Sequence, residues 1–228
     1  VQAPGFHFQN TGLPIASDPA TNLCVKAYEL MKQRFPDLSP IHMHLHKEIP
    51  MGAGLGGGSS DGAFALKALN DHFGKGLSPQ ELVDMALQLG SDCPFFIVNR
   101  PVLAQGRGEI MEPVNVSLSG YELVMIHPGI HVSTKEAFAG IIPHETGTDL
   151  KNKISEPVDQ WKNWLVNQFE TSVGAKYPVI LDIRNMLYEK GAVYASMSGS
   201  GSVVFGLFRS KPDLTVKPGW KLISLTLK

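Results

Sequence analysis

The sequence predicts an α+β protein in which helices and short strands are mixed along the chain. In several segments apolar residues recur at three- and four-residue spacing, as on one face of a helix, and in others they alternate with polar residues, as in a strand. With 43% hydrophobic residues among 228, the chain can bury a sizeable core. Its length fits one large domain or two small ones, and we expect two, residues 1–118 and 119–228.

The first half opens with an extended, turn-rich segment, followed by a helix that begins at Asn22 and ends before Pro36. Residues 41–46 alternate apolar residues with histidines, which predicts a strand buried on one face. A glycine-rich loop at 52–58 then leads through two serines into a second helix. A third helix is predicted from Ser78, where a capping box has proline at the first helical position, to a C-cap at Gly90.

The remaining elements are shorter and are separated by glycine and proline residues. The turn at 106–108 separates two predicted strands, 102–104 and 123–126. Two helical patterns follow, around residues 161–169 and 178–189. The last predicted strands are 195–197, 203–208 and 222–225.

The balance of charges excludes some classes of partner. The 20 basic and 21 acidic residues leave a net charge of −1, so we expect neither nucleic acid nor an anionic membrane surface as partner. The two cysteines are too few for a disulfide framework, and no apolar run approaches the ~20 residues of a membrane span. Without a signal-peptide pattern, we expect a cytoplasmic protein that acts on a small molecule.

The segment from Pro50 to Ser60 (PMGAGLGGGSS) is the strongest functional signal. Glycine allows positive φ angles and lets a ligand approach the backbone closely. Several consecutive N–H groups beside the positive end of a helix dipole favour an anion, and polyphosphate is the obvious candidate. A flexible linker is the alternative, although linkers seldom join an alternating strand to a regular helix.

Two common phosphate loops do not fit this segment. A P-loop needs a lysine before its final serine or threonine, and Gly58 stands at that position. Gly52, Gly54 and Gly57 match the dinucleotide-binding fingerprint, but that fold requires a second parallel strand ending in an acidic residue about twenty residues later. The sequence continues instead with residues 70–74 (NDHFG) and another helix.

The pattern Pro50-x-x-x-Gly54-Leu55-Gly56-x-Gly58-Ser59-Ser60 resembles the ATP-binding motif of the GHMP kinases, a superfamily of small-molecule kinases. Within the superfamily, the chain is most similar to the kinases that phosphorylate a cytidine diphosphate-linked alcohol in isoprenoid precursor synthesis. Four stretches in the same order carry the likeness, namely 22–27, the glycine loop, 90–95 and 195–202.

This resemblance implies a fold, two ligands and a set of binding residues. The N-terminal half would resemble ribosomal protein S5, and the C-terminal half a ferredoxin-like sandwich. ATP would lie against the glycine loop, and Mg²⁺ would bridge phosphate oxygens. The ATP-binding residues implied are Asn22, Pro50, Gly52, Gly54, Leu55, Gly56, Gly57, Gly58, Ser59 and Ser60.

Asp92 is the candidate catalytic residue. By the resemblance, it is the base that takes the proton of the accepting hydroxyl, a task that suits a carboxylate because the alcohol becomes acidic as its oxygen bonds to phosphorus. Its position before Pro94 has a second explanation, because aspartate before proline is a normal start of a helix.

The resemblance also places substrate-binding residues in the second half: Thr134, Phe138, Gly199, Ser200 and Gly201. Phe138 would help to sandwich the cytosine ring, and the glycine-serine stretch at 198–202 would close over the phosphates. Each has a structural alternative. Phe138 on a helix is compatible with a core position, and glycines at 198–202 are compatible with a hairpin turn.

Three histidines, His42, His44 and His46, share one face of the predicted strand. The outer two are about 13 Å apart along a strand, whereas zinc–nitrogen bonds are only about 2 Å long. All three therefore cannot reach one metal ion, and we expect an alternating polar face.

One departure from the family leaves alternatives open. The family begins with a strand carrying a Lys-x-Asn-Leu pattern, whose lysine helps to activate the hydroxyl, and nothing in this sequence matches it. We expect either that this segment lies outside the chain or that the protein is a divergent member. The alternative functions are phosphorylation of another small alcohol, such as homoserine or phosphomevalonate, and nucleotide binding without catalysis.

Overall fold

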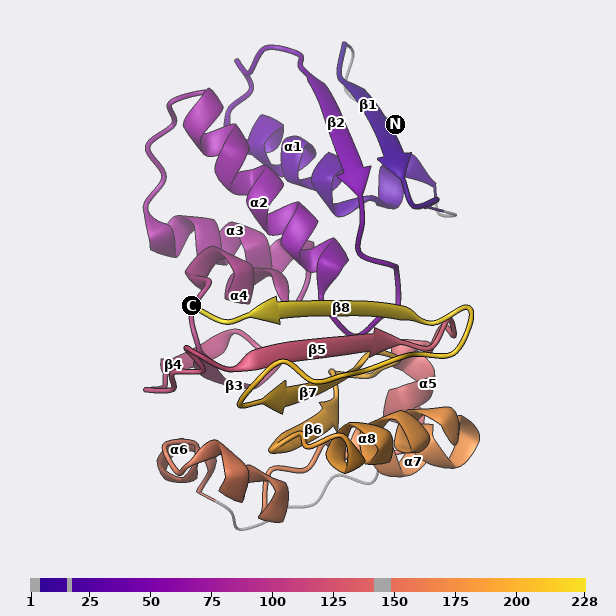
Figure 1. Cartoon of the computed structure of the whole chain (residues 1–228). Helices are drawn as coiled ribbons and strands as arrows, with labels where there is room; N and C mark the ends of the chain where they lie inside the picture. Colours follow the sequence, from indigo (N-terminus) through magenta and orange to yellow (C-terminus); the bar gives the residue numbers. More distant parts are fainter. Residues whose placement is uncertain (1–4, 16–17, 142–148) are drawn as a thin grey trace. The chain divides into compact units, whose positions relative to one another are not determined.

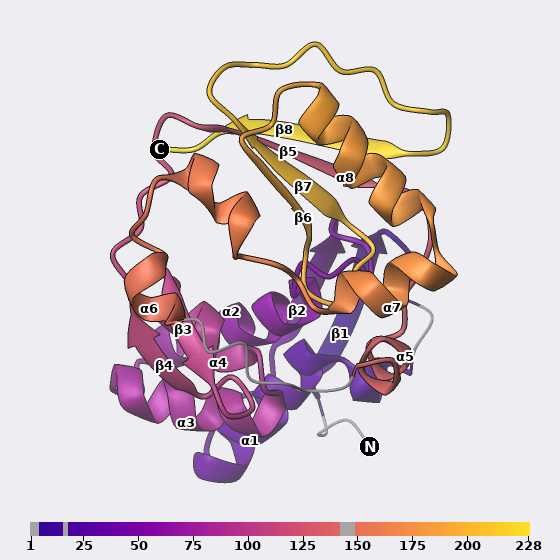
Figure 2. The ribbon, with the colours of Figure 1, turned by 90° about the horizontal axis from the view of Figure 1, so that it is seen from below.

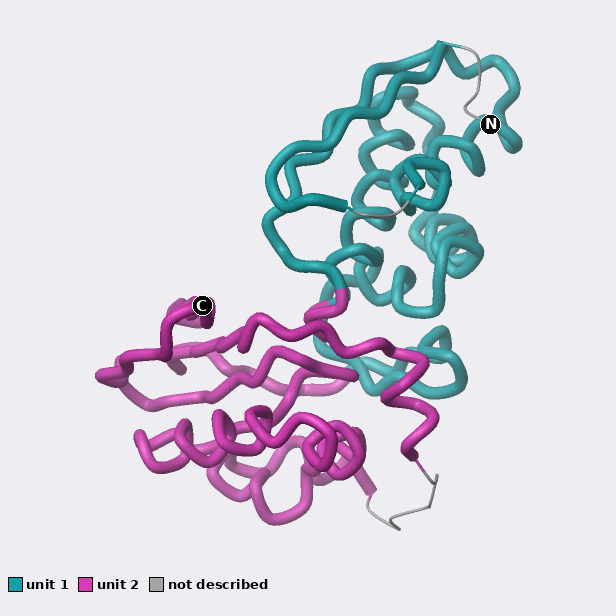
Figure 3. The backbone as a smooth tube through the Cα atoms, turned by 90° about the vertical axis from the view of Figure 1, so that its right-hand side faces the viewer, with its two compact units in different colours: residues 1–51, 56–113 teal, residues 52–55, 114–228 magenta. Residues whose placement is uncertain are grey.

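The computed structural model of the protein describes residues 5–15, 18–141 and 149–228. Helices and strands are mixed along the chain (Figure 1), which confirms the α+β class. The chain forms two compact units, drawn in different colours in Figure 3. The first contains residues 1–51 and 56–113, and the second contains 52–55 and 114–228. The domain boundary at Ser119 stays a prediction. Within the described residues, no helix has both the length and the apolar character needed to cross a membrane.

The first unit consists of four helices with two small strand pairs. Its elements are β1 (His7–Gly12), the short 3-10 helix η1 (Pro19–Thr21), α1 (Leu23–Arg34), β2 (His42–Lys47), α2 (Gly57–His72), α3 (Pro79–Leu89), α4 (Cys93–Val98), β3 (Val102–Gln105) and β4 (Ile110–Pro113). β1 pairs with β2 in parallel, and β3 pairs with β4 as an antiparallel hairpin.

Local interactions define where the helices of the first unit begin. Asn22 caps α1, because its side-chain oxygen accepts a hydrogen bond of 2.9 Å from the N–H of Cys24. The capping box predicted at the start of α3 is confirmed, with Ser78 and Glu81 bonding each other's backbone N–H groups. At Gly62, a Cβ atom would lie 2.7 Å from the Cβ of Leu23, so this glycine permits α1 and α2 to pack closely.

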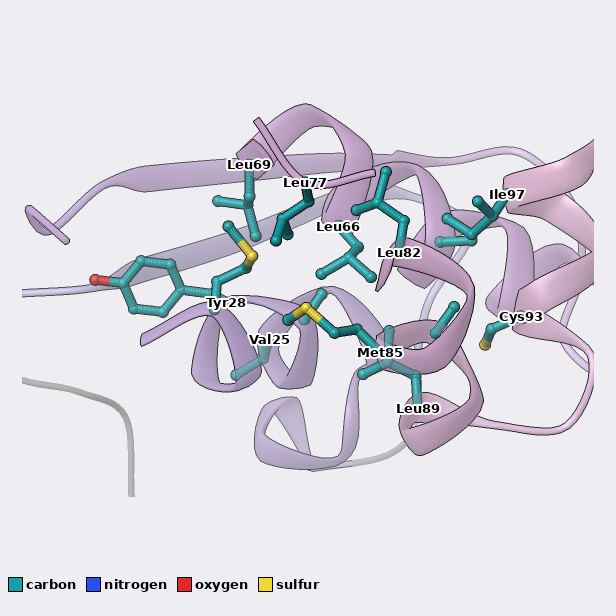
Figure 4. Close-up of a cluster of buried hydrophobic side chains, with 14 of the residues drawn as sticks. Val25, Tyr28, Leu66, Leu69, Leu77, Leu82, Met85, Leu89, Cys93 and Ile97 are labelled. Atoms are coloured by element: carbon teal, nitrogen blue, oxygen red, sulfur yellow. The ribbon is translucent and has the colours of Figure 1, made fainter. Parts of the chain in front are cut away.

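A continuous apolar core lies between the four helices of this unit (Figure 4). Burial of these side chains is the main stabilising contribution to the unit. Phe6 stacks on Tyr28 with ring centroids 4.3 Å apart, which anchors the segment before β1 onto α1. The labelled members in Figure 4 are Val25, Tyr28, Leu66, Leu69, Leu77, Leu82, Met85, Leu89, Cys93 and Ile97.

The second unit is a four-stranded antiparallel sheet in the order β6-β7-β5-β8, with α7 and α8 on one face (Figure 2). Its elements are β5 (Glu122–His127), α5 (Thr134–Ala139), α6 (Leu150–Lys153), the 3-10 helix η2 (Val158–Asn163), α7 (Phe169–Lys176), α8 (Val179–Glu189), β6 (Tyr194–Met197), β7 (Val204–Phe208) and β8 (Lys221–Thr226). β7 lies between β5 and β6, the split order of a ferredoxin-like sheet.

The core of the second unit forms where α8 packs on the sheet. Ile180, Ile183 and Leu187 recur at helical spacing on α8 and are fully buried. They pack with buried strand residues that include Ile126 of β5 and Val204 of β7. Burial on both faces explains why β6 and β7 are almost continuously apolar in sequence.

Three details of the sequence prediction are wrong. Strands β1 and β4 were not predicted. The helix expected at 161–169 is replaced by η2 and a non-helical stretch before α7, because the side chain of Asn167 accepts a hydrogen bond from the N–H of Phe169 and so starts a new helix there. Ser59 and Ser60 lie inside the first turn of α2, which begins at Gly57, rather than before it.

Candidate active site

The glycine loop connects β2 to α2 and ends at the helix N-cap, Gly56. Gly56 has a φ angle of +63°, and no side chain caps the helix there. The first hydrogen bond of the turn runs from the N–H of Ser60 to the carbonyl of Gly56, at 2.9 Å. The N–H groups of Gly57, Gly58 and Ser59 therefore have no partner within the helix, and they mark the positive end of its dipole.

Two positions in this loop require glycine. Gly54 has a φ angle of +74°, and a Cβ atom on it would lie 2.0 Å from the carbonyl oxygen of Ser198. On Gly56, a Cβ would lie 2.8 Å from the ring of Phe96 on α4. Any larger residue would displace the loop at either position, so the path of the backbone depends on these two glycines.

A buried ion pair lies beneath the start of α2. Lys47, the last residue of β2, is 3% exposed and pairs with Asp61 in the second turn of α2. Its ammonium nitrogen lies 3.3 Å from the position that a Cβ on Gly57 would take. The pair therefore joins the two ends of the loop, and its ammonium group lies close to the first-turn amides.

The same pair influences a neighbouring thiol. Burial, together with the Asp61 carboxylate, raises the pKa of Cys24 to about 12, and the Lys47 ammonium opposes this only in part. Cys24 is consequently a neutral thiol at physiological pH and serves as a core residue.

Asp92 is the N-cap residue of α4, but its side chain makes no capping hydrogen bond. The structural alternative that the sequence left open, a capping carboxylate, is therefore not realised in this geometry. The ring of Phe96, on the same helix as Cys93, lies against Gly56 at the start of α2, 2.8 Å from where a Cβ on Gly56 would lie. This contact brings Asp92 close to the helical end of the glycine loop, within the first unit.

Burial raises the pKa of the Cys93 thiol above its ordinary value, and the negative charge of Asp92 contributes in the same direction. The thiol is thus protonated at neutral pH. Its role is structural, because Cys93 is fully buried in the apolar core of the first unit.

The turn of the β3–β4 hairpin lies over the segment before α4. Arg107 donates a hydrogen bond of 3.1 Å to the hydroxyl of Ser91. A Cβ on Gly108 would lie 3.0 Å from the carbonyl oxygen of Ser91 and 3.9 Å from Oδ1 of Asp92. The sequence identified this turn only as a separator of strands, and it gave no signal that the turn neighbours Asp92.

The stretch 198–202 joins β6 to β7 and contacts the first part of the glycine loop, residues 52–55, which belong to the same unit. The hydroxyl of Ser198 donates to the carbonyl of Gly54 at 2.7 Å, and the N–H of Val203 donates to the carbonyl of Ala53 at 3.1 Å. The hairpin turn that the sequence offered as an alternative is present, and it packs on the glycine loop.

Thr134 and Ser200, two of the predicted substrate-binding residues, lie close together at this hairpin. Thr134 is the first residue of α5, and its hydroxyl lies 3.4 Å from that of Ser200. Phe138, on the same helix, is 63% exposed, with its ring edge-on to Phe169 at a centroid distance of 4.9 Å. The core position considered for Phe138 is therefore wrong, and its exposed ring is accessible for stacking.

The structure brings the predicted residues together in two groups. Within the first unit, Gly56–Ser60 lie beside the start of α4 with Asp92. Within the second, residues 52–55, the 198–202 stretch and Thr134 are in contact. Asn22 stands apart from these contacts as the cap of α1, and its predicted role toward ATP stays a prediction.

The three histidines of β2 are exposed and alternate with the half-buried Met43 and Leu45, as the strand pattern predicted. Thr11 of the neighbouring strand lies 2.9 Å from a ring nitrogen of both His44 and His46. The histidines thus form a polar face that pairs with β1 through side-chain hydrogen bonds.

Comparison with known proteins connects both units to one family. Residues 22–100 match the GHMP kinases N terminal domain, and residues 156–215 match the GHMP kinases C terminal domain. The chain is 51% identical over 210 residues to the 4-diphosphocytidyl-2-C-methyl-D-erythritol kinase of Bacteroides fragilis (strain ATCC 25285), covering 92% of this chain and 76% of that protein. The kinase of the same name from Cytophaga hutchinsonii is 50% identical over 207 residues, covering 90% and 76%.

Solved structures give a consistent result. A crystal structure of 4-(cytidine 5'-diphospho)-2C-methyl-D-erythritol kinase matches with a TM-score of 0.70 and 28% identity, covering 89% of this chain and 73% of that one. A homoserine kinase from Cytophaga hutchinsonii matches with a TM-score of 0.76 over 98% of this chain and 82% of that one. Its identity is only 17%, so this likeness concerns the fold.

Proposed function

The chain belongs to the GHMP kinase family of small-molecule kinases, and we propose that it transfers the γ-phosphoryl group of ATP to the hydroxyl of 4-diphosphocytidyl-2-C-methyl-D-erythritol. The observation that carries the proposal is the 51% identity over 92% of the chain to a kinase of that name. The reaction belongs to the non-mevalonate synthesis of isoprenoid precursors. The geometry of each unit supports a role in this reaction.

In the first unit, the start of α2 fits a polyphosphate. The N–H groups of Gly57, Gly58 and Ser59 are available because the helix has no side-chain cap. They would hydrogen-bond phosphate oxygens, and the ammonium of Lys47, paired with Asp61, lies next to the same turn. When bound between phosphate oxygens, Mg²⁺ would neutralise charge on the transferring group.

Asp92 is suited to act as the general base. Its side chain is exposed and makes no capping bond, so the carboxylate is free to accept a proton. It would take the proton of the substrate hydroxyl as the oxygen bonds to the γ-phosphorus and the bond to the departing ADP breaks. The loop amides would stabilise the negative charge on the transferring phosphoryl group.

In the second unit, α5 and the β6–β7 hairpin offer groups for the substrate. The exposed ring of Phe138 provides a surface on which cytosine would stack. The hydroxyls of Thr134 and Ser200 provide polar contacts. These residues would give the preference for a cytidine-linked alcohol over a small alcohol without a base.

The test is a phosphoryl-transfer assay with ATP and three acceptors: 4-diphosphocytidyl-2-C-methyl-D-erythritol, homoserine and phosphomevalonate. Phosphorus NMR and mass spectrometry of the products identify the phosphorylated alcohol. We expect a phosphorylated product from the first acceptor only, and a lower rate with it in Phe138→Ala. Lys135→Ala, on an exposed neighbouring position of α5, is the matched control and should leave the rate unchanged.

Two results would contradict the proposal. Phosphorylation of homoserine or phosphomevalonate, with none of the cytidyl compound, would assign another acceptor to the same fold. ATP binding without transfer to any of the three would identify a nucleotide-binding protein without this activity.

A further inference from the structure

A buried carboxylate in the second unit takes no part in the chemistry described above. Glu170, on α7, is 5% exposed. One of its oxygens accepts hydrogen bonds from the N–H of Met197 at 2.7 Å and from the hydroxyl of Ser196 at 2.9 Å. The other oxygen pairs with the guanidinium of Arg184 on α8. The charge is thus fully compensated, and it is directed at the end of β6 where the 198–202 stretch begins.

Asn167, three residues earlier, bonds the same stretch. Its side-chain NH₂ donates two hydrogen bonds of 2.8 Å, one to the carbonyl of Met197 and one to the carbonyl of Gly199. Its side-chain oxygen accepts from the N–H of Phe169 at 3.0 Å. Both of its N–H donors are therefore used, and the bond to its oxygen fixes the orientation of the amide.

Resting on the proposed function, we propose that Asn167 and Glu170 are positioning residues for phosphoryl transfer. They clasp both backbone groups of Met197 and the carbonyl of Gly199. Ser198 lies between Met197 and Gly199 in the chain. It is thereby held where its hydroxyl donates to the carbonyl of Gly54 in the glycine loop. The clasp thus sets the course of residues 52–55 without touching the substrate.

The position of Ser198 affects the glycine loop because Gly54 packs tightly against it. Its α-carbon leaves no room for a Cβ against the carbonyl of Ser198, so the hairpin and the glycine loop cannot slide past each other. A displaced hairpin must either lose the Ser198 bond or shift Gly54. Misplacement of a binding loop by about 1 Å is enough to lower a rate about 100-fold.

Asn167→Asp separates positioning from folding. Aspartate keeps the oxygen that accepts from Phe169, so α7 retains its start, but it cannot donate to the two carbonyls and places a negative oxygen against them. Tyr188→Phe is the matched control. It removes a hydrogen bond of 3.1 Å from Tyr188 to the carbonyl of Ala195, on the same strand but outside the clasp.

The experiment measures amide hydrogen exchange and steady-state kinetics on the full chain, well below the melting temperature. In Asn167→Asp we expect faster exchange in peptides covering 196–203 and 52–55, and kcat/KM lowered about 10- to 100-fold. Tyr188→Phe should change kcat/KM less than twofold. Glu170→Gln keeps a carbonyl acceptor for Met197 and should fall between the two.

A purely structural role would lower the melting temperature of Asn167→Asp and leave kcat/KM within twofold, which would overturn the inference. Unchanged exchange at 52–55 would also overturn it. If Asn167→Asp fails to fold, Glu170→Gln and Asn167→Ala are judged by the same two readouts. The exchange arm does not depend on which alcohol is phosphorylated, so a failure of the proposed substrate is recognised separately.

Discussion

The molecule contains two glycine-serine loops, and they differ in what their backbone groups do. Residues 52–58 run into α2, where the amides of the first turn are left without helical partners. Residues 198–202 turn back between β6 and β7, and their backbone bonds inward: the N–H of Gly201 to the carbonyl of Ser198, and the N–H of Ser198 to the carbonyl of Val203. The first-turn amides of α2 have no helical partner, whereas two amides of the second loop, those of Ser198 and Gly201, are bonded within the hairpin.

The supports of the two loops differ as well. Beneath the first lies the Lys47–Asp61 ion pair, whose ammonium group is next to the first-turn amides. The second is held by the side chains of Asn167 and Glu170, which leave no net charge facing it once Arg184 is counted. Similar sequences thus lead into a helix with open first-turn amides in one place and form a hairpin held by side chains in the other.

The largest expected effect concerns Asp92, which lies beside the first loop. Asp92→Asn keeps the shape but removes the base, so kcat should fall by about 10²–10⁴ with little change in the KM for ATP. Steady-state kinetics with 4-diphosphocytidyl-2-C-methyl-D-erythritol measure both constants. A variant that retains more than about a tenth of the kcat would remove Asp92 from the mechanism.

The second prediction concerns how tightly the two loops fit together. Gly54→Ala combines a positive φ with a clash against Ser198, so we expect ATP affinity to fall more than about tenfold, equivalent to roughly 1.4 kcal/mol. Gly58→Ala is the control for folding. Gly58 lies within the first turn of α2, and a Cβ there meets nothing within 4 Å, so urea unfolding should show unchanged or slightly greater stability.

The glycine loop and Asp92 illustrate what could be predicted from the sequence. The glycine loop and its connection to a helix were predicted because glycine spacing, an alternating strand and a helical pattern are all local signals. Asp92 was identified by its motif, although the sequence left its capping role open. The structure shows no capping bond from Asp92, which only the three-dimensional arrangement of α4 displays, and the catalytic role stays a prediction.

The side chains that hold the two loops in place could not be predicted from the sequence. Asn167 falls in a segment predicted as helix, and its two bonds reach residues thirty and more positions away. In the sequence, Lys47 is only a polar residue at the end of a strand. Its pairing with Asp61 depends on where α2 lies in the fold. Strand β1 was missed because its exposed, polar residues show no alternation, and its parallel pairing with β2 is a tertiary property.

The third prediction compares the buried ion pair with an exposed one. Lys47→Met leaves the Asp61 carboxylate, which is 25% exposed, without its partner. Loss of one partner of a buried pair costs roughly 3–5 kcal/mol, and we expect the lower end because water reaches Asp61. Urea unfolding measures the change.

Arg34→Met is the matched control for this comparison. It breaks the Arg34–Glu81 pair, whose side chains are about 40% exposed, and should cost less than about 1 kcal/mol. Equal losses of unfolding free energy in the two variants would show that the buried Lys47–Asp61 pair stabilises the chain no more than an exposed pair does.

The smallest expected effect is a dependence on alkaline pH. Burial near Asp61 raises the pKa of Cys24 from 9.0 to about 12 in the folded chain. The folded state then holds this proton more tightly than the unfolded state, so its contribution to stability is complete below pH 9 and is lost as the pH rises toward 12. Between pH 8 and pH 10, the free energy of unfolding should fall by about 1 kcal/mol more in the natural chain than in Cys24→Ala.

The contrast between the two loops is tested most directly by NMR of the ¹⁵N-labelled chain during titration with a non-hydrolysable ATP analogue and Mg²⁺. We expect the largest amide shifts at Gly57, Gly58 and Ser59, because these first-turn N–H groups have no partner within the helix and can bind phosphate. The amides of Ser198 and Gly201 should keep slow hydrogen exchange, because they remain bonded within the hairpin. Saturable binding that leaves the amides of Gly57, Gly58 and Ser59 unchanged would contradict the assignment of this segment as the phosphate-binding loop.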